Sequence, residues 1–191
     1  MGLFGWLKRK NGDGPGAGLV AWRKAWAEAL ARTEAGEAGD LARALDALGL
    51  AEEEVEIERE MLEGLRQLQA LRATLSGGLL PIVTTGHRVV AQDVCHFVAP
   101  ASMPDDPAQP SGRLILTNVR AIFVGGARST SVPWHAIART SCADRDVVLV
   151  RPDRDTLYRF RCNSYADALC GELIARQLAA PRLRGGGSDR V

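Results

Sequence analysis

The three histidines and four cysteines are the side chains of this chain best suited to bind a metal ion. A tetrahedral zinc site generally takes its ligands from short paired spacings such as C-x₂₋₄-C. None of the cysteines is paired in that way, and the adjacent residues Cys95 and His96 would point to opposite faces of a strand. We therefore expect neither a metal site nor another cofactor. The candidate set is His87, Cys95, His96, Cys142 and Cys162.

The cysteines and several serines are also candidates for a catalytic nucleophile. Such a nucleophile needs a histidine or another base within hydrogen-bond reach. Cys95 with His135 would supply these residue types, and so would Ser131 or Ser141 in place of Cys95. The chain contains no nucleophile elbow, P-loop or HExxH motif. We predict a protein without catalytic residues, and an enzyme with a Cys or Ser nucleophile is an alternative.

The first ten residues combine apolar side chains with a basic cluster. In such a segment, tryptophan and aliphatic side chains sit at the acyl boundary of a membrane while lysines and arginines meet anionic head groups. Each basic residue near the surface contributes about 1 kcal/mol, so a segment this short binds weakly and reversibly. The membrane-contact candidates are Leu3, Phe4, Trp6, Leu7, Lys8, Arg9 and Lys10. The alternative is that these apolar residues dock on the protein itself or on a protein partner.

Composition and charge limit the class of protein. The net charge of +1 argues against a nucleic-acid binder, which needs a strongly basic surface. No run of about 18 apolar residues is present, so we expect no transmembrane helix. Seven basic and twelve acidic residues make the stretch 19–76 acidic, whereas both ends of the chain are basic. We expect a cytoplasmic protein with reduced cysteines, whose basic N-terminus allows a peripheral position at the inner membrane face.

The stretch 19–76 predicts a small acidic helical domain. Leu19, Trp22, Trp26 and Leu30 are spaced 3, 4 and 4 residues apart, as the buried face of one helix requires. Asp40 is placed to cap a second, short helix. In front of this domain, residues 1–10 form the amphipathic basic segment, and residues 11–18, half of them glycine, form a flexible linker.

A third helix is predicted from about residue 51. Its apolar residues follow a heptad-like spacing, which favours packing within a three-helix unit. The glutamates between 52 and 60 are predicted to form its solvated face. The predicted seam consists of Ile57, Met61, Gly64, Leu68, Leu71 and Leu75, and Leu62 and Leu65 widen it.

From residue 79 the pattern changes to short strands separated by turn residues, which is typical of a barrel or a sandwich. A C-terminal helix follows, capped by Asn163 or Ser164, and a disordered tail covers 181–191. The predicted fold class is therefore α+β: a small helical domain, then a seven-stranded barrel with a C-terminal helix over 79–180. The predicted strands are 94–101, 113–117, 120–124, 130–133, 136–142, 146–151 and 157–162.

Three stretches of this second domain carry a family resemblance. Gly112–Gly126 reads GRLILTNVRAIFVGG, and it is flanked by the strand patterns of Gln92–Pro100 and Ser131–Thr140. The stretch Gly112–Gly126 resembles the hairpin pattern G-R-L-x-L-T-N-x-R-x-I-F-x-G of bacterial pleckstrin-homology-like (PH-like) and GRAM-like domains. Seven strands followed by one helix is also the element order of the PH fold. The resemblance implies a barrel plugged by its helix, which serves as a platform for lipid head groups, peptides or partner proteins.

Phosphoinositide-binding PH domains carry lysines and arginines in the loop between their first two strands. In this chain that loop is Met103–Gly112, which contains Asp105 and Asp106 and no basic residue. Phosphate groups would be repelled there. Arg128, in the loop after Gly126, is a candidate ligand contact, although a single arginine is not a site.

We therefore expect a non-catalytic adaptor that its N-terminus targets weakly to an anionic membrane surface and that carries a PH/GRAM-like platform for lipid or protein. The first alternative is a cytosolic protein–protein interaction module without a membrane role. The second is the enzyme named above. The sequence leaves the ligand, the partner and the oligomeric state open.

Overall fold

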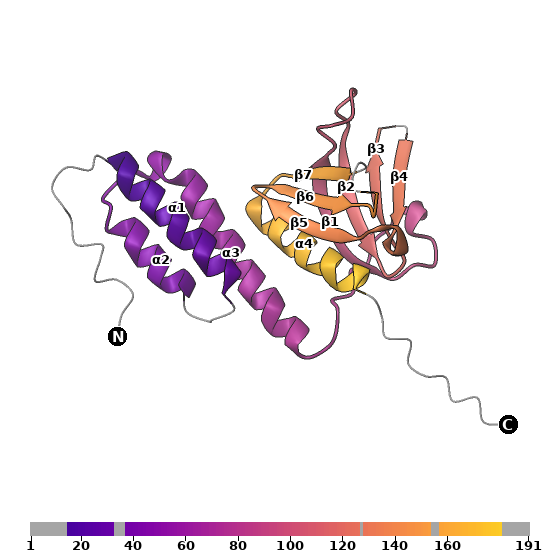
Figure 1. Ribbon diagram of the computed structural model, residues 1–191, viewed down its shortest axis with the longest axis horizontal. Helices are drawn as coiled ribbons and strands as arrows, with labels where there is room; N and C mark the ends of the chain where they lie inside the picture. The colour runs from indigo at the N-terminus through magenta and orange to yellow at the C-terminus, as the bar shows by residue number, and fades with distance from the viewer. Residues whose placement is uncertain (1–14, 33–36, 127, 154–156, 181–191) are drawn as a thin grey trace. The chain divides into compact units, whose positions relative to one another are not determined.

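The computed structural model describes residues 15–32, 37–126, 128–153 and 157–180 (Figure 1). The chain divides into two compact units, unit 1 from Met1 to Arg66 and unit 2 from Gln67 to Val191. The sequence places the boundary at the end of the third helix, whereas the division falls within that helix.

Unit 1 is helical. Its elements are α1 (Pro15–Ala31), α2 (Glu37–Asp46), the short 3₁₀ helix η1 (Glu52–Glu54) and the first part of α3 (Glu56–Ser76). α1 begins inside the stretch predicted to be a linker, because proline is favoured at the first position of a helix. α2 begins at Glu37, so Asp40 lies in its first turn, where the helix dipole favours an acidic residue, and the predicted cap is wrong.

Two tryptophans of α1 hold the helices of unit 1 together. Trp22 and Trp26 are 3% and 8% exposed, which confirms the prediction that they belong to the core. The indole Nε1 of Trp22 donates a hydrogen bond to the carbonyl oxygen of Leu41 in α2, and that of Trp26 donates one to the carbonyl oxygen of Met61 in α3, each at 2.8 Å. α1 is therefore tied to both other helices by buried indoles whose N–H groups are satisfied.

A buried carboxylate lies on the apolar face of α3. Glu58 is 1% exposed, and its Oε1 lies 2.7 Å from Nε and 2.5 Å from Nη2 of Arg23. Two predictions are therefore wrong: Ile57, which was assigned to the seam, is 49% exposed, and the glutamates between 52 and 60 are not all solvated. A charged residue, Glu58, is buried at the start of the helix, where the apolar pattern assigns Ile57. Further along α3 the predicted seam is confirmed at Met61 and Leu68, which are 6% and 4% exposed.

The described part of unit 2 contains the end of α3, seven strands and a C-terminal helix. A 3₁₀ helix, η2 (Arg88–Val90), precedes the first strand, η3 (Trp134–Ala136) separates the fourth from the fifth, and α4 (Tyr165–Ala179) follows the last. The seven predicted strands and the helix are confirmed, with shifts of a few residues at their ends. The strands are β1 (Cys95–Ser102), β2 (Ser111–Thr117), β3 (Arg120–Gly125), β4 (Arg128–Pro133), β5 (Arg139–Ala143), β6 (Asp146–Val150) and β7 (Leu157–Cys162).

The strands form one antiparallel sheet in the order β4-β3-β2-β1-β7-β6-β5. β4 and β5 are the edges of this order, so the hydrogen-bonded sheet is open and not closed into a barrel. A contact across the sheet shows that the sheet is strongly curved. Phe123 of β3 and Phe160 of β7 stack with their ring centroids 5.9 Å apart. In a flat sheet, the three strand steps between β3 and β7 would separate the two residues by about 14 Å. Residues from both halves of the sheet therefore share one core.

α4 covers this core (Figure 1). Ser164 precedes the helix, and its Oγ accepts a hydrogen bond from the backbone N–H of Asp167 at 3.1 Å, which confirms Ser164 as the cap. Ala168, Ile174 and Leu178 of α4 belong to the same cluster as Phe123 of the sheet. The helix thus fills the concave side of the curved sheet.

A second apolar cluster lies on the other face of β1–β3. Val90, from the irregular segment 79–94, packs there with Ile115 of β2 and Ile122 of β3. Side chains alternate between the two faces of a strand, and here both faces are covered. This explains why three successive residues of β2, Leu114–Leu116, are all fully buried.

Gly112→Ala is expected to lower the free energy of unfolding by about 3 kcal/mol. A Cβ at Gly112 would lie 1.9 Å from the carbonyl oxygen of Val124 and 2.7 Å from Cα of Gly125, its partner on β3, so the two strands would have to separate. Urea unfolding of the full chain measures the loss. Gly86→Ala is the control, because nothing lies within 4 Å of a Cβ there. Equal losses in both variants would contradict the steric argument.

Candidate functional site

The predicted site residues fall outside the described side chains. The segment with the membrane-contact candidates, Leu3, Phe4, Trp6, Leu7, Lys8, Arg9 and Lys10, lies in the range 1–14, which the structure does not describe. Arg128 is the first residue of β4, but its side chain is not among those described. Both assignments stay predictions.

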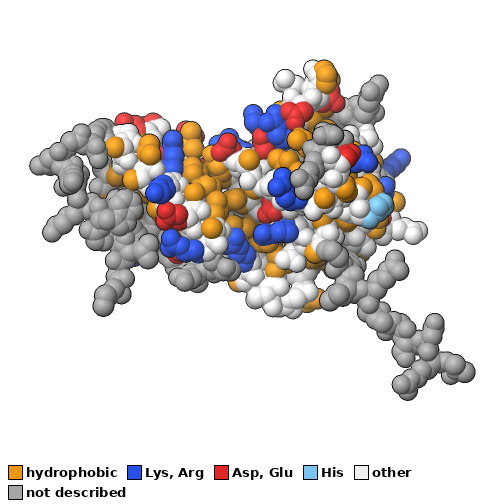
Figure 2. Space-filling model, viewed as in Figure 1, with side chains coloured by type: hydrophobic (Ala, Val, Ile, Leu, Met, Phe, Trp, Pro, Cys, Tyr) orange, Lys and Arg blue, Asp and Glu red, His pale blue; other side chains and the backbone are white. Residues whose placement is uncertain are grey.

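Intramolecular ion pairs occupy the end of the sheet that carries the β1–β2 loop. Nη2 of Arg159 in β7 lies 2.5 Å from Oδ1 of Asp105 in that loop. Arg161, also in β7, donates from Nε and Nη2 to the two carboxylate oxygens of Asp146 at 2.9 and 3.1 Å. Asp146 is 6% exposed, so this bidentate pair involves a largely buried carboxylate. Acidic and basic side chains lie next to each other on the viewed face of unit 2 (Figure 2).

These pairs limit what this loop end can bind. A phosphate group would have to compete with Asp105 and Asp146 for the two guanidinium groups. The hydrogen bond with Asp146 also raises the pKa of Arg161. Asp106 adds another carboxylate, whose Oδ1 accepts a hydrogen bond from the N–H of Ala108 at 2.9 Å. The structure therefore places two arginines of β7 beside the acidic loop, each paired with a carboxylate, and the predicted repulsion of phosphate stays a prediction.

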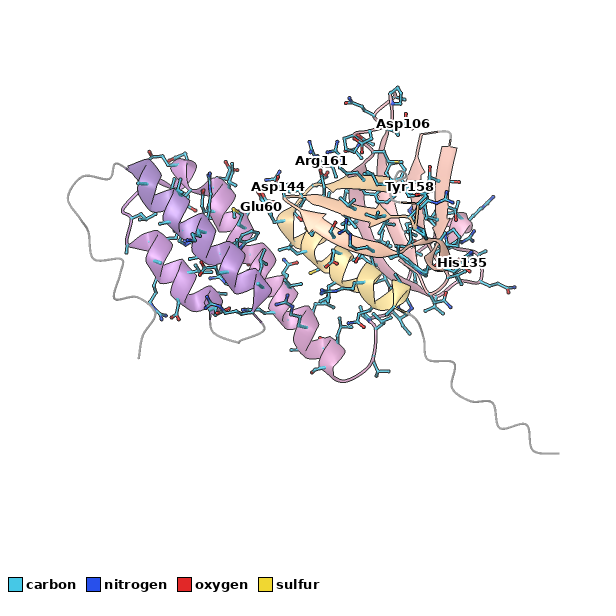
Figure 3. The ribbon with its side chains drawn as sticks, viewed as in Figure 1. Glu60, Asp106, His135, Asp144, Tyr158 and Arg161 are labelled. Carbon is cyan, nitrogen blue, oxygen red and sulfur yellow. The ribbon has the colours of Figure 1, made fainter. Side chains whose placement is uncertain are left out.

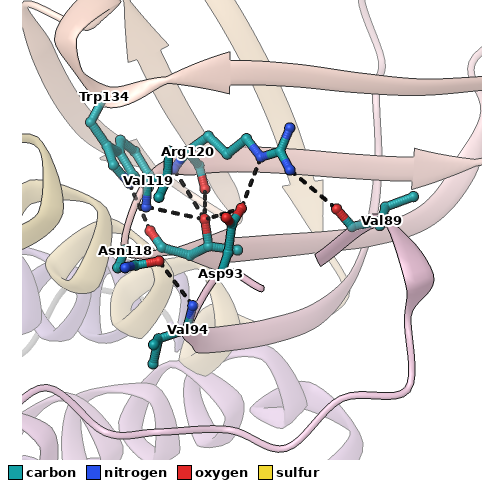
Figure 4. A network of polar contacts seen from close by, with 8 residues as sticks. Val89, Asp93, Val94, Asn118, Val119, Arg120 and Trp134 are labelled. Atoms are coloured by element: carbon teal, nitrogen blue, oxygen red, sulfur yellow. Dashed lines mark hydrogen bonds and ion pairs between the residues drawn. The ribbon is translucent and has the colours of Figure 1, made fainter. Parts of the chain in front are cut away.

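The opposite end of the sheet is built around the side chain of Thr117, which is 0% exposed. Figure 4 labels residues of the surrounding network, among them Asp93, Asn118 and Arg120. Its Oγ1 accepts hydrogen bonds from the backbone N–H groups of Val119 at 3.2 Å and Arg120 at 3.1 Å. The hydroxyl has two acceptors within reach, the carbonyl oxygen of Arg120 at 3.0 Å and Oδ2 of Asp93 at 3.3 Å. A single hydroxyl therefore organises the β2–β3 turn.

Asn118 and Arg120 connect this turn to the segment that precedes β1. Oδ1 of Asn118 accepts a hydrogen bond from the N–H of Val94, and the N–H of Asn118 donates to the carbonyl oxygen of Val94, both at 2.9 Å. Nε of Arg120 lies 2.9 Å from Oδ2 of Asp93, and its Nη2 donates to the carbonyl oxygen of Val89 at 3.3 Å. The T-N-x-R part of the hairpin pattern therefore joins the β2–β3 turn to the segment before β1. We call the hydrogen-bonded group of Thr117, Asn118, Arg120 and Asp93 the hairpin lock, or the lock for short.

Three aliphatic side chains are exposed around this lock. Val119 is 50%, Val94 39% and Ile82 77% exposed. Hydrogen bonds hold residues 81 and 83 to the start of β1 and Val94 to the β2–β3 turn, so all three lie at the same end of the sheet. We call Ile82, Val94 and Val119 the hairpin-end patch. The sequence does not reveal this patch, because hydrophobic periodicity identifies buried faces and not isolated apolar residues in turns.

Burial governs the chemistry of the cysteine thiols. It raises the pKa of Cys142 and of Cys162 to about 12 and that of Cys170 to about 11, and it also raises the pKa of Cys95. Thiols with such pKa values are protonated at neutral pH, whereas the thiolate is the nucleophile. Cys95 packs in the second apolar cluster, and its Sγ donates a hydrogen bond to the carbonyl oxygen of Phe97 at 3.5 Å.

The histidines that were considered as metal ligands occupy different surroundings. His96 is 8% exposed, and its Nδ1 lies 2.7 Å from the carbonyl oxygen of Pro81. His87 is half-buried and precedes η2. Across the described ranges, no three His, Cys, Asp or Glu side chains are grouped as a metal ion would require. In the same ranges, no helix combines the length and the hydropathy needed to cross a bilayer.

No protein-family model and no curated protein matches this sequence. Among solved structures, the chain is similar to the C-terminal domain of an unknown protein from Leishmania infantum, with 13% identity and a TM-score of 0.40 over 47% of this chain and 88% of that one. It is also similar to the activated truncation of Vav1, with 10% identity and a TM-score of 0.41 over 86% of this chain and 47% of that one. The chain thus spans about half the length of the Vav1 chain. These comparisons do not assign the chain to a family.

Thr117→Val is expected to lower the free energy of unfolding by about 2 kcal/mol, because it removes the hydroxyl that two backbone N–H groups need as their acceptor. Thr117→Ser keeps the hydroxyl and is the matched control. Chemical unfolding of the full chain compares the two variants. A Val variant as stable as the Ser variant would show that the lock contributes little.

Stability is expected to decrease as the pH rises from about 9 to about 12. Folding raises the thiol pKa of Cys142 and of Cys162 from 9.0 to about 12, so in this range the unfolded chain has released protons that the folded chain retains. Cys142→Ala removes one such group and should make the decrease shallower. Denaturant unfolding at a series of pH values tests this. Parallel curves for the wild type and the variant would contradict the raised pKa of Cys142.

Proposed function

We propose that this chain is a non-catalytic adaptor whose unit 2 is a barrel-like PH/GRAM platform for lipid or protein and whose N-terminal segment, residues 1–10, contacts an anionic membrane surface. The observation that carries the proposal is the topology of unit 2. Seven antiparallel strands form one curved sheet around a core, and the helix that follows them covers this core. This is the element order that the sequence resemblance implies.

The hairpin lock supports the assignment of the platform. Thr117, Asn118 and Arg120 belong to the stretch that resembles PH-like domains. Thr117 organises the β2–β3 turn, and Asn118 and Arg120 connect this turn to the segment before β1. Residues used for architecture support a fold and leave its ligand open.

The membrane role rests on the N-terminal sequence. Leu3, Phe4, Trp6 and Leu7 are followed directly by three basic residues. The cations of the loop end are paired with Asp105 and Asp146, so we assign the attraction to anionic lipid to the N-terminus and not to that loop.

The thiol chemistry supports the non-catalytic part of the proposal. An enzyme with a cysteine nucleophile needs a thiolate near neutral pH, and burial raises the pKa of every cysteine of the chain. Cys95, the cysteine considered with His135, packs among apolar side chains.

Co-sedimentation with vesicles of equal parts phosphatidylserine and phosphatidylcholine tests the membrane role. The full-length chain is expected to pellet at low salt and to remain in the supernatant at high salt, because salt screens the basic residues from the lipid. A chain that starts at Asn11 keeps α1 whole and should lose binding. Replacement of Lys8, Arg9 and Lys10 by glutamine removes the charges and keeps the apolar residues, so it measures the contribution of the charges to binding.

Two results would change the assignment. If the chain from Asn11 pellets like the full-length protein, unit 1 or unit 2 carries the membrane contact and the N-terminal role is wrong. If the full-length protein does not pellet at low salt, the membrane role fails, and the protein–protein interaction module becomes the better description.

A further inference from the structure

We infer that the hairpin-end patch is a second membrane contact, through which Ile82, Val94 and Val119 enter the surface of an anionic bilayer while Arg88 meets its head groups. This inference rests on the proposed membrane role and deepens it, because it assigns the lipid-facing end of unit 2.

The first argument is the exposure of the patch. In the described part of unit 2, the exposed large hydrophobic side chains are Leu79, Ile82, Val94, Val119 and Leu157. Three of these five belong to the patch, on three chain segments that hydrogen bonds bring to one end of the sheet. Transfer of such apolar side chains from water into a membrane surface lowers the free energy.

The second argument is rigidity. Val119 and Val94 flank the lock in which the N–H of Val119 is bonded to Thr117 and both backbone groups of Val94 are bonded to Asn118. The carbonyl oxygen of Val119 accepts a further hydrogen bond from the N–H of Trp134 at 3.3 Å. A patch held in this way does not have to be ordered on binding, which removes part of the entropic cost of association.

The third argument is charge. Asp93, the carboxylate of the lock, has a side chain 17% exposed and is paired with Arg120. Arg88 is exposed and has no ion-pair partner among the described residues. At the loop end, Asp105 and Asp146 are likewise paired, with Arg159 and Arg161. Asp106 has no ion-pair partner among the described residues, and its Oδ1 accepts a hydrogen bond from the N–H of Ala108. Among the described residues, the charge left without an ion-pair partner is therefore a cation, Arg88, at the hairpin end and a carboxylate, Asp106, at the loop end, and this difference favours the hairpin end for an anionic surface.

Figure 3 shows the separation of these two ends, with Asp106 labelled at the loop end and His135 at the hairpin end of unit 2. His135 is exposed and follows Trp134, whose N–H is bonded to Val119. The two ends are thus distinct surfaces, and one end can face a membrane while the acidic loop faces away.

The fourth argument is the weakness of a single contact. A short amphipathic segment binds a membrane only marginally, and stable attachment takes two signals. A second contact in the same chain raises the overall affinity through effective concentration without changing either contact. The sequence of the N-terminal segment combines apolar and basic residues, and the hairpin-end patch combines exposed aliphatic residues with Arg88. This shared chemistry favours a lipid surface over a protein as the occupant.

The test is vesicle co-sedimentation of full-length variants with equal parts phosphatidylserine and phosphatidylcholine. Val119→Asp places a carboxylate in the patch, and binding is expected to weaken about tenfold. Leu157→Asp is the matched control, because Leu157 is 49% exposed, as Val119 is 50% exposed, but lies outside the patch. Thermal unfolding followed by circular dichroism verifies that the variants are folded. If Val119→Asp does not fold, Ile82→Asp replaces it.

The outcomes separate this inference from the proposed function. Loss of binding in Val119→Asp or Ile82→Asp, with normal binding in Leu157→Asp, supports the patch. Wild-type binding in both patch variants overturns it, and so does an equal loss in Leu157→Asp, which would reflect added negative charge alone. If the patch variants bind normally while the chain from Asn11 does not, the patch fails and the N-terminal role stands. If no protein pellets, both fail, and a protein partner becomes the expected occupant.

Discussion

A hydroxyl removed from water has to find partners, and the partners of Thr117 tie together the parts of unit 2 that are far apart in sequence. Through Asp93 and Arg120, the same few atoms connect the β2–β3 turn with the segment that crosses the outer face of the sheet. That segment supplies Val90 to the second apolar cluster. The lock and this cluster therefore depend on each other. The lock positions the covering segment, and the covering segment shields the hydrogen bonds of the lock from water.

The strand domain could be predicted well from the sequence because its apolar residues and its turns agree. Gly125, Asn118 and the prolines of the β1–β2 loop mark the strand ends, and the strands lie where the pattern places them. The curvature was less accessible. It depends on contacts such as that between Phe123 and Phe160, which are distant in sequence and three strands apart in the sheet. Sequence pattern specifies strands, whereas the packing of side chains decides how the sheet bends.

The sequence-based predictions fail where contacts between distant segments decide the position of a side chain. Glu58 occupies a core position because Arg23, on another helix, neutralises it, and no pattern along one helix contains that information. The hairpin-end patch was missed for a related reason. Val94 and Val119 are unremarkable singly, and hydrogen bonds between segments bring them to one end of the sheet. The N-terminal candidates and Arg128 stay predictions, because their side chains lie outside the described residues.

The open sheet has a consequence for the behaviour of the protein at high concentration. Among the described residues, each edge strand has one side without a neighbouring strand, and such an edge can template the addition of strands from other molecules. Both edges carry features that oppose this. β4 begins with Arg128 and ends with Pro133, and β5 has only five residues, of which the first is Arg139. Charge, proline and short length discourage intermolecular pairing, so the sheet can stay open without inviting aggregation.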